Sequence, residues 1–371
     1  MQRRPVQGAA LMELRTQLRR AAGYFACNEA LVHGERRFSF AEAWSRGVRL
    51  ANALTNAGLR PGDKIATLEK NSIEAADIFL AAAIGNFVRV PLYARNRRES
   101  HAHMMRNTDC RLALVDNALL PEVAGLETEL PDLKRLIVRD GTYEEWLARA
   151  SDQDPDPTIS PDDYCVIRHT GGTTGAPKGV AYTHRTWMTC CAGFLEVGPR
   201  PDPGATVLHV GPLSHASGFM FSPYWAVGSR NIMVEAFDPA SFLEILEREE
   251  VGYAFVAPTM LNAVVHHGNP RGHVFPRLRC LLSASAPVSE ATLRKARSIF
   301  GDDVLHTAYG QTEILPVTAL GPKEWFGETE GSTPLQSVGR AMSFVDLEIR
   351  DADGRALGPD EPGEIVARFE N

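Results

Sequence analysis

The chain has 371 residues, of which 44% are hydrophobic and 23% are charged, and its formal net charge is −7. That length exceeds one ordinary domain and suits a large α/β catalytic body built from roughly two or three lobes. The 39 basic residues are scattered rather than gathered in a stripe, which argues against nucleic acid as the main partner.

The cysteines and the apolar runs indicate the cellular location. The six cysteines show neither CxxC spacing nor a nearby His pattern, which favours free thiols in a reducing, cytoplasmic location over a metal site or a disulfide framework. The longest nearly apolar run, residues 78–88, is about half the length of a bilayer span, so we expect no transmembrane helix. Residues 1–20 are Arg-rich and amphipathic, which favours an ordinary first helix and leaves an organelle transit peptide as the alternative.

Residues 28–150 alternate strand-like pieces with helical ones. Residues 30–58 are predicted to form a hairpin that leads into a helix ending near Gly58, and residues 73–85 are predicted to form a second helix. Because short strands alternate with helices of this length, we expect parallel pairing with helices on both faces of a sheet. The strands are expected at 63–69, 87–93, 110–116 and 133–138.

The acidic, Pro-rich piece at 151–163 interrupts this pattern and is predicted to be an exposed connector. After it the alternation of strands and helices resumes. Further strands are expected at 164–170, 205–212, 231–236, 253–259 and 278–285. Further helices are expected at 184–197, 239–251 and 289–301.

The last part of the chain has a different pattern. Residues 345–357 alternate apolar and polar side chains around an Asp-Gly turn, and residues 363–369 are the expected next strand. This pattern predicts a small antiparallel β unit that begins near residue 336.

Residues 169–180, HTGGTTGAPKGV, form a loop rich in Gly and Thr with a single Lys. The loop follows an apolar strand and is expected to lead directly into a helix, where backbone N–H groups and the helix dipole favour an anion. Its glycines permit close backbone approach, its threonines offer hydroxyl donors and Lys178 adds positive charge. The pattern therefore indicates a phosphate ligand, although it is not the pattern of the common nucleotide P-loop. The alternative is a surface loop that binds no ligand.

Residues 307–313, TAYGQTE, follow a predicted strand and carry groups that suit a nucleotide. The ring of Tyr309 can stack on a base, and Thr312 offers a hydroxyl. The carboxylate of Glu313 can help to hold Mg²⁺, a hard ion that prefers oxygen ligands and substrate phosphates. The alternative is that this stretch begins a helix with a capping interaction.

Two further stretches contain candidate residues. His215 follows an apolar strand among small residues in PLSHASGF, and a purely structural histidine is the alternative. Residues 283–289, SASAPVS, end a strand with small side chains against which a flat ligand could lie, and close packing is the alternative. Neither a Ser-His-Asp order nor a paired-carboxylate spacing stands out, so a hydrolase is not supported.

Together these stretches resemble, in order and spacing, the adenylate-forming superfamily of acyl-CoA synthetases, peptide-synthetase adenylation domains and luciferases. TGGTTGAPKGV resembles the phosphate loop of that family, with Gly171 where Ser is usual, and YGQTE matches its Tyr-Gly-x-Thr-Glu motif. SASAP stands where the family has its adenine-wall strand, and PLSH resembles the histidine motif near its acyl pocket. The resemblance runs from about residue 28 to residue 371.

The resemblance implies an α/β fold of two predominantly parallel sheets with flanking helices, layered αβαβα, and the start of a small barrel-like β-rich subdomain. Residues 1–165 would form the first α/β subdomain, 166–335 the second and 336–371 part of the β-rich subdomain. The Thr-Gly-Asp motif of the family and its C-terminal lid domain, with a catalytic lysine, would come after GEIVAR. We therefore expect the chain to be a fragment with little complete turnover by itself.

The implied reaction joins a carboxylic acid to ATP, giving an acyl-adenylate and pyrophosphate, after which a thiol, usually that of CoA, takes the acyl group. Lys178, Thr312, Glu313 and His215 would be the catalytic residues, with Glu313 on Mg²⁺. In-line attack on the α-phosphate needs charge neutralisation and positioning more than acid-base chemistry. The implied ATP-binding residues are Thr170, Gly171, Gly172, Thr173, Thr174, Gly175, Lys178, Ser283, Ala284, Ser285, Ala286, Tyr309, Gly310, Gln311 and Thr312.

A hydrophobic acid, whether fatty, alicyclic or aryl, fits the sequence better than an amino acid. Amino-acid-activating relatives place an aspartate for the substrate ammonium in the region after the histidine motif, and HASGFMFSPYW offers none. A carrier protein is the alternative acceptor to CoA, and a non-catalytic nucleotide- or acyl-binding module is the alternative from another class. The expected pocket residues, each of which also suits plain core packing, are His215, Phe219, Phe221, Ala284, Gly310 and Ile314, with Trp225 and Leu315 beside them.

Overall fold

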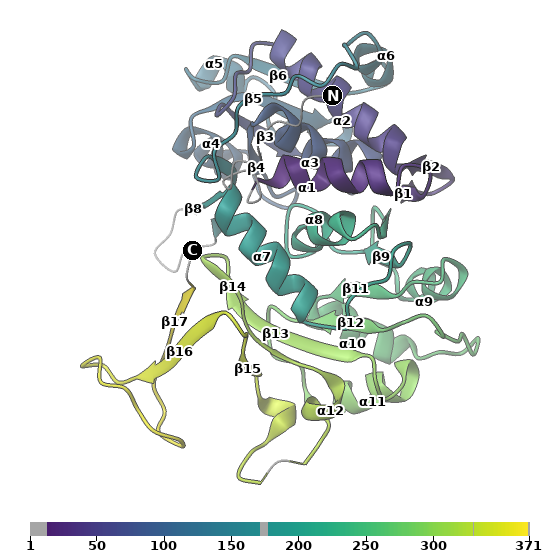
Figure 1. Ribbon diagram of the computed structural model, residues 1–371, viewed down its shortest axis with the longest axis vertical. Coiled ribbons are helices and arrows are strands. Elements are labelled where there is room, and N and C mark those ends of the chain that lie inside the picture. The colour runs from purple at the N-terminus through teal and green to yellow at the C-terminus, as the bar shows by residue number, and fades with distance from the viewer. Residues whose placement is uncertain (1–12, 171–176, 329, 370–371) are drawn as a thin grey trace, which may run out of the picture. The chain divides into compact units, whose positions relative to one another are not determined.

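The computed structural model describes residues 13–170, 177–328 and 330–369. The chain divides into two compact units, one made of Met1–Cys191 with Pro201–Ala236 and the other of Ala192–Arg200 with Phe237–Asn371. Each unit combines parallel strands with helices and is an α/β body in its own right (Figure 1).

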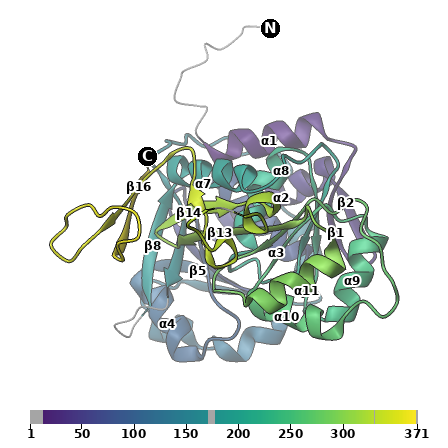
Figure 2. The same cartoon turned by 90° about the horizontal axis from the view of Figure 1, so that it is seen from below.

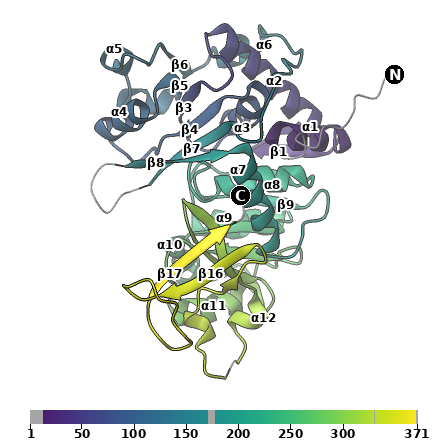
Figure 3. The same ribbon diagram turned by 60° about the vertical axis from the view of Figure 1, so that its left-hand side comes forward.

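The first unit contains a six-stranded sheet with the order β6-β5-β3-β4-β7-β8 (Figure 3). Its neighbours pair in parallel except for β7 and β8, which are antiparallel. The central strands are buried along almost their whole length, as expected where helices cover both faces. The bounds are β3 (Lys64–Leu68), β4 (Val88–Pro91), β5 (Cys110–Asp116), β6 (Arg135–Arg139), β7 (Tyr164–Thr170) and β8 (Lys178–Thr183).

Helices α2 (Phe40–Asn56) and α3 (Ile73–Gly85) pack against each other in this unit. A capping box starts α2, because the hydroxyl of Ser39 accepts from the backbone N–H of Glu42 while the Glu42 carboxylate accepts from that of Ser39. Every residue of α3 except Glu74 is buried, which identifies α3 as a core helix. Among the residues that the structure describes, no helix has the length and apolarity to cross a membrane.

The first unit also contains four strands in the order β9-β10-β1-β2. They pair in parallel except at the β1–β2 hairpin. Their bounds are β1 (Glu29–His33), β2 (Arg36–Ser39), β9 (Thr206–His209) and β10 (Arg230–Met233). The remaining helices are α1 (Leu14–Tyr24), α4 (Arg98–Asn107), η2 (Asn117–Glu122), α5 (Leu126–Glu129), α6 (Tyr143–Ala148) and α8 (Gly218–Ala226), while α7 (His184–Glu196) begins in this unit and ends in the second.

The second unit is built on the strands β11 to β15. Strands β11, β12 and β13 are parallel, and β13, β14 and β15 are antiparallel. Helices α9, α10 and α11 lie side by side in this unit (Figure 2). The bounds are α9 (Pro239–Arg248), β11 (Tyr253–Val256), α10 (Pro258–His267), β12 (Cys280–Ser283), α11 (Glu290–Phe300), β13 (Leu305–Gln311), β14 (Ile314–Leu320), α12 (Pro322–Trp325), η3 (Pro334–Gln336), β15 (Arg340–Ala341), β16 (Val345–Arg350) and β17 (Glu364–Phe369).

The predicted fold class, two large and predominantly parallel sheets flanked by helices, is confirmed. The exposed connector at 151–163 has no regular structure, and β16 pairs antiparallel with β17, as expected for the last part of the chain. The subdomain limits at 165/166 and 335/336 remain a prediction.

One local prediction was wrong, and one alternative reading is excluded. Strand β8, rather than a helix, directly follows the Gly/Thr-rich loop, because Val180, Tyr182 and Thr183 favour extended backbone and pair with β7. The Tyr-Gly-x-Thr-Glu stretch does not start a helix either, since it lies in the β13–β14 hairpin. Helices α4, α8 and α10 had not been predicted.

Candidate active site

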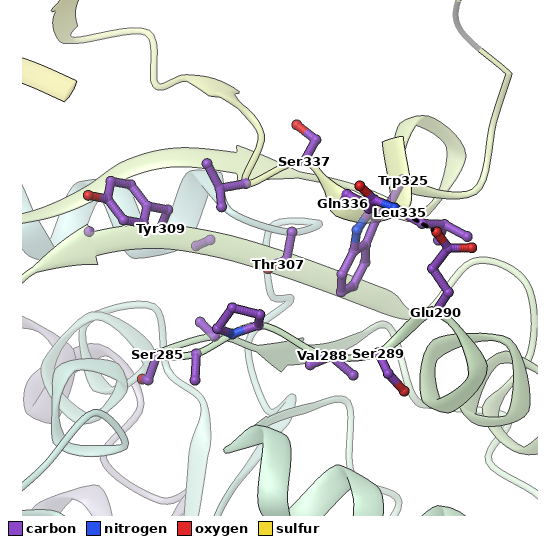
Figure 4. Close-up of a pocket in the computed structure, with 16 residues that line it drawn as sticks. Ser285, Val288, Ser289, Glu290, Thr307, Tyr309, Trp325, Leu335, Gln336 and Ser337 are labelled. Carbon is purple, nitrogen blue, oxygen red and sulfur yellow. Dashed lines mark hydrogen bonds between the residues drawn. The ribbon is translucent and has the colours of Figure 1, made fainter. Parts of the chain in front are cut away.

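A cavity of about 520 Å³ lies in the second unit at the carboxyl ends of β12 and β13. These parallel neighbours end side by side, so the residues that follow β12 face the last residues of β13. Ligand sites in α/β sheets lie at such ends. Figure 4 shows the lining residues, which are Ala284, Ser285, Ala286, Pro287, Val288, Ser289, Glu290, Thr307, Ala308, Tyr309, Gly310, Trp325, Leu335, Gln336, Ser337 and Val338.

A hydrogen bond and an unusual backbone conformation characterise residues 284–286, which form one wall of the cavity. The hydroxyl of Thr307 donates to the backbone carbonyl of Ser283 at 2.9 Å, which ties β13 to the last residue of β12. Ser285 has a backbone φ of 81°, a left-handed value that is uncommon for any residue but glycine. Backbone strain of this kind gathers at functional sites, so Ser285 fits a position where the chain is shaped for a ligand.

Gly310 allows the β13–β14 hairpin to close tightly. A Cβ at this position would lie 2.7 Å from the Leu315 Cβ and 2.9 Å from the carbonyl oxygen of Ile314. The ladder shifts register between Tyr309 and Gln311, and Gln311 then pairs with Ile314. Only a glycine therefore fits between the ring of Tyr309 and the turn without displacing the second strand.

Thr312 and Glu313 are the two residues of the hairpin turn between Gln311 and Ile314. Thr312 is half-buried and Glu313 is exposed. Neither residue lines the cavity, and the same holds for Ser283, Gln311 and Ile314. The second unit thus brings five predicted site residues into one cavity, namely Ala284, Ser285, Ala286, Tyr309 and Gly310.

Glu313 is the predicted Mg²⁺ ligand, and its surroundings show what kind of ion site it can form. Among the described residues, no group of three His, Cys, Asp or Glu side chains could hold a metal, and Glu313 forms no ion pair. Proteins often hold Mg²⁺ through one or two carboxylates while substrate phosphates and water complete its shell. A single exposed carboxylate therefore fits an ion that arrives with ATP.

In the first unit, Thr170 ends β7 and Lys178 begins β8, and the two are directly paired in the antiparallel ladder. Thr170 is half-buried and Lys178 is exposed. A Cβ on the next residue, Gly179, would lie 2.9 Å from the Ile167 Cγ2, so the start of β8 requires a glycine. The predicted phosphate-loop residues Gly171, Gly172, Thr173, Thr174 and Gly175 lie outside the described residues.

His215 lies beside Tyr93, with ring centroids 4.3 Å apart, and its Nδ1 is 2.9 Å from the hydroxyl oxygen of Ser214. Desolvation, together with the positive charges of Arg168 and Arg95, lowers the pKa of His215 to about 4. The imidazole is therefore uncharged at neutral pH.

Phe219 and Phe221 are both buried in the first unit. The ring of Phe219 stacks on that of Trp187 with centroids 5.1 Å apart, and the guanidinium of Arg168 lies over the Phe219 ring at 4.2 Å from its centroid. Phe221 is fully buried against Phe79, at a centroid distance of 4.6 Å, and it stacks on the buried Trp225. The structure therefore places Phe221 in the core. Arg168 also donates a hydrogen bond to the Ser214 carbonyl at 2.6 Å, so it connects Phe219 to the segment that contains His215.

Sequence reasoning missed part of the cavity wall. Thr307 and Ala308 belong to the recognised stretch and could have been included, because they directly precede Tyr309 in the same strand. Trp325 and residues 335–338 come from later segments that reach the cavity only through the tertiary fold, and their local sequence contains no signal for a ligand.

The model of the AMP-binding enzyme family matches residues 18–371. The chain belongs to the AMP-binding enzyme family. Feruloyl-CoA synthase from Amycolatopsis sp. is 32% identical to this AMP-binding protein over 346 residues, which is 92% of the chain and 67% of the relative. The long-chain-fatty-acid–CoA ligase from Thermus thermophilus is 29% identical over 359 residues, which is 92% of the chain and 66% of the relative.

A solved structure shares the fold of this AMP-binding protein. The inhibitor-bound N-terminal domain of FACL13 from Mycobacterium tuberculosis matches with a TM-score of 0.85 at 23% sequence identity, covering 96% of this chain and 89% of that domain. The chain spans about two thirds of the length of the curated relatives, 67% of the synthase and 66% of the fatty-acid ligase. The predicted family and its N-terminal-domain fold are thus confirmed.

Proposed function

We propose that this AMP-binding protein activates a hydrophobic carboxylic acid with ATP, forming an acyl-adenylate, and then transfers the acyl group to the thiol of CoA. The observation that carries the proposal is the cavity at the ends of β12 and β13, where the small residues 284–286 and Tyr309 line the same space. Adenine is flat, and such a pairing of a backbone wall with an aromatic ring suits it. The relatives named as CoA ligases support the acid-thiol reaction.

Each unit has a hairpin that carries candidate groups for the phosphates of ATP, β7–β8 in the first unit and β13–β14 in the second. Thr170 and Lys178 supply a hydroxyl and an ammonium at the ends of paired strands, and Lys178 adds the positive charge that pyrophosphate requires. Thr312 would contact the α-phosphate, and Glu313 would hold Mg²⁺. The bound ion would supply charge neutralisation for the phosphate oxygens.

The two chemical steps need few protein groups. In the first step, a carboxylate oxygen of the acid forms a bond to the α-phosphorus of ATP while the bond from that phosphorus to the bridging oxygen breaks, releasing pyrophosphate. In the second step, the thiolate sulfur of CoA bonds to the acyl carbon and AMP leaves, the thiol proton having gone to solvent. Lys178 would stabilise the charge that develops on the leaving pyrophosphate.

The neutral ring of His215 would line the acyl site beside Tyr93. An uncharged imidazole does not form an ion pair with the attacking carboxylate, so the carboxylate keeps its nucleophilic oxygen available. The names of the two relatives refer to an aryl acid and a fatty acid, and both are hydrophobic. They support the choice of substrate class over an amino acid.

Pyrophosphate exchange into ATP tests the first step, and it is measured on this chain completed with the C-terminal lid domain that the family resemblance implies. A panel containing a hydroxycinnamate, a long-chain fatty acid, an alicyclic acid and an amino acid should give exchange with one of the first three and none with the amino acid. ATP binding without acid-dependent exchange would favour a non-catalytic binding module. Thioester formation with CoA, compared with formation on a phosphopantetheine-bearing carrier protein, then decides the acceptor, and exclusive loading of the carrier would overturn the CoA assignment.

A further inference from the structure

A small cavity of about 20 Å³ lies inside the first unit and shares no lining residue with the candidate site. That volume accommodates one water-sized particle or one monatomic ion. It is too small for a carboxylate, a phosphate or a nucleotide. The residues that enclose the cavity, all of them buried, are Leu14, Phe79, Ala82, Ala83, Arg89, Cys165, Val166, Trp187 and Ser222.

Arg89 on β4 is the one cation in this lining, and it is only 3% exposed. Its guanidinium lies 3.7 Å from the ring centroid of Phe79. Among the described residues Arg89 forms no ion pair, and its Nη1 has no hydrogen-bond partner. A buried charge without a partner is strongly destabilising, so a counter-charge at this place would relieve that penalty.

The charges nearby leave Arg89 in a positive environment. Glu69 attracts it, but the Glu69 carboxylate is already paired with Arg139 at 2.7 Å, and both are buried. Arg168 is a second buried cation without an ion pair among the described residues. Burial first, and then the charge of Arg168, lower the pKa of Arg89 to about 9.

Ser222 on α8 provides a second donor to the cavity. It is 2% exposed, and its hydroxyl has no hydrogen-bond partner among the described residues. The thiol of Cys165 already donates to the Tyr182 carbonyl at 3.6 Å, and the other lining side chains are apolar except for Trp187, whose indole N–H is also a donor. The side chains therefore offer a cation and a hydroxyl donor with no carboxylate or carbonyl, which suits a guest that only accepts hydrogen bonds.

We propose that this cavity binds a small monovalent anion of the chloride class between the guanidinium of Arg89 and the hydroxyl of Ser222. A halide accepts from both donors, neutralises the buried charge and matches the size of the cavity. Water matches the size but leaves the charge of Arg89 uncompensated. The proposal is independent of the acyl-CoA ligase activity, since neither residue belongs to the candidate active site.

Bromide provides a direct test, because its anomalous scattering distinguishes it from water. Crystals of the protein soaked in sodium bromide should show an anomalous peak within hydrogen-bond distance of the Arg89 guanidinium and the Ser222 hydroxyl. Non-anomalous density at that place would mean an ordered water only and would overturn the proposal.

Thermal unfolding supplies a second test in solution. At constant ionic strength, replacing gluconate, which is too large for the cavity, with about 0.2 M chloride should raise the melting temperature by about 2 °C or more. Arg89→Met should abolish this dependence, and Ser222→Ala should shift its midpoint to higher chloride. Arg97→Met, at an exposed arginine, is the matched control and should keep the full dependence. A folded Arg89→Met protein with an unchanged chloride response would show that the effect arises elsewhere, and the bromide test applies even if that variant does not fold.

Discussion

At the scale of single residues, Lys178 and Glu313 carry the charges on which the proposed adenylation depends. Both side chains are exposed, so replacing them should leave the free energy of unfolding within about 0.5 kcal/mol of wild type. Lys178→Ala and Glu313→Gln should each lower the rate of acid-dependent pyrophosphate exchange by about 10²-fold or more, because each removes a preorganised charge.

Two exposed residues of the second unit provide matched controls. Lys323→Ala and Glu328→Gln make the same chemical changes at residues outside both motifs and should keep wild-type exchange rates. Wild-type rates from both Lys178→Ala and Glu313→Gln would contradict the assignment of the site.

Gly310 is a residue whose role is steric. Gly310→Ala would place a methyl carbon 2.7 Å from the Leu315 Cβ, so β14 must move. We expect a loss of about 1 to 3 kcal/mol in the free energy of unfolding, measured by urea denaturation, together with weaker ATP binding. Gly141→Ala, where a Cβ meets nothing within 4 Å, should change the stability by less than about 0.5 kcal/mol. Equal effects at the two positions would contradict the steric explanation.

At the scale of elements, the site depends on how β12 and β13 end together. The hydroxyl of Thr307 is the side-chain link between them, since it donates to the carbonyl of Ser283. Thr307→Val keeps the shape and removes the donor, so it should lower the free energy of unfolding by about 0.5 to 1.5 kcal/mol. Because the link fixes the wall at residues 284–286, the dissociation constant for ATP should rise as well.

Calorimetric titration of ATP, run beside urea denaturation, separates these two effects. Thr333→Val, at an exposed threonine that does not line the cavity, is the control for the loss of a hydroxyl. ATP affinity unchanged by Thr307→Val would show that the strand link does not position the wall.

The β7–β8 and β13–β14 hairpins explain why the helix expected after the first motif and the helix start considered at the second motif are both absent from these stretches. Both recognised motifs contain Gly and Thr followed by a charged residue, a pattern that also starts helices. Pairing with β7 and with β13 stabilises extended backbone instead. Such pairing partners come from the tertiary fold, and the local sequence alone does not reveal them.

At the scale of the whole molecule, buried histidines predict how stability depends on pH. Burial lowers the pKa values of His169, His184 and His209 to about 4 in the folded protein, against about 6.5 when unfolded. Between these values the unfolded chain binds more protons, so stability is complete above pH 6.5 and is lost as the pH falls toward 4. Each histidine contributes a loss of up to about 1.4 kcal/mol per pH unit.

Urea denaturation between about pH 7 and pH 5 measures this slope. His184→Gln keeps a side chain that can bond to the backbone N–H of Leu14 and removes one titrating group, so its slope should be smaller by about one proton. A stability that does not change over this range would contradict the burial of these histidines in neutral form.

Local residue patterns were enough to predict the family and most of the alternation of strands and helices, because motif spacing and hydrophobic periodicity can be recognised before the chain is folded. The order of the TGGTTGAPKGV, SASAP and YGQTE stretches was enough to predict an adenylate-forming fold, and the family match and the topology confirm it. The apolar composition of a segment such as α3 is enough to predict that its helix is buried in the core.

Only the tertiary structure decided which residues share a cavity and which are core. Trp325 and residues 335–338 reach the cavity wall from later segments of the chain, while Phe221, which is also apolar, is fully buried against Phe79. The unpaired charge of Arg89 is likewise a result of packing. The sequence predicts an arginine in a strand, but only the fold shows that, among the described residues, this arginine forms no ion pair. Cavities and ion pairs depend on contacts between residues that are far apart in the chain. These contacts form only on folding, so local sequence patterns do not predict them.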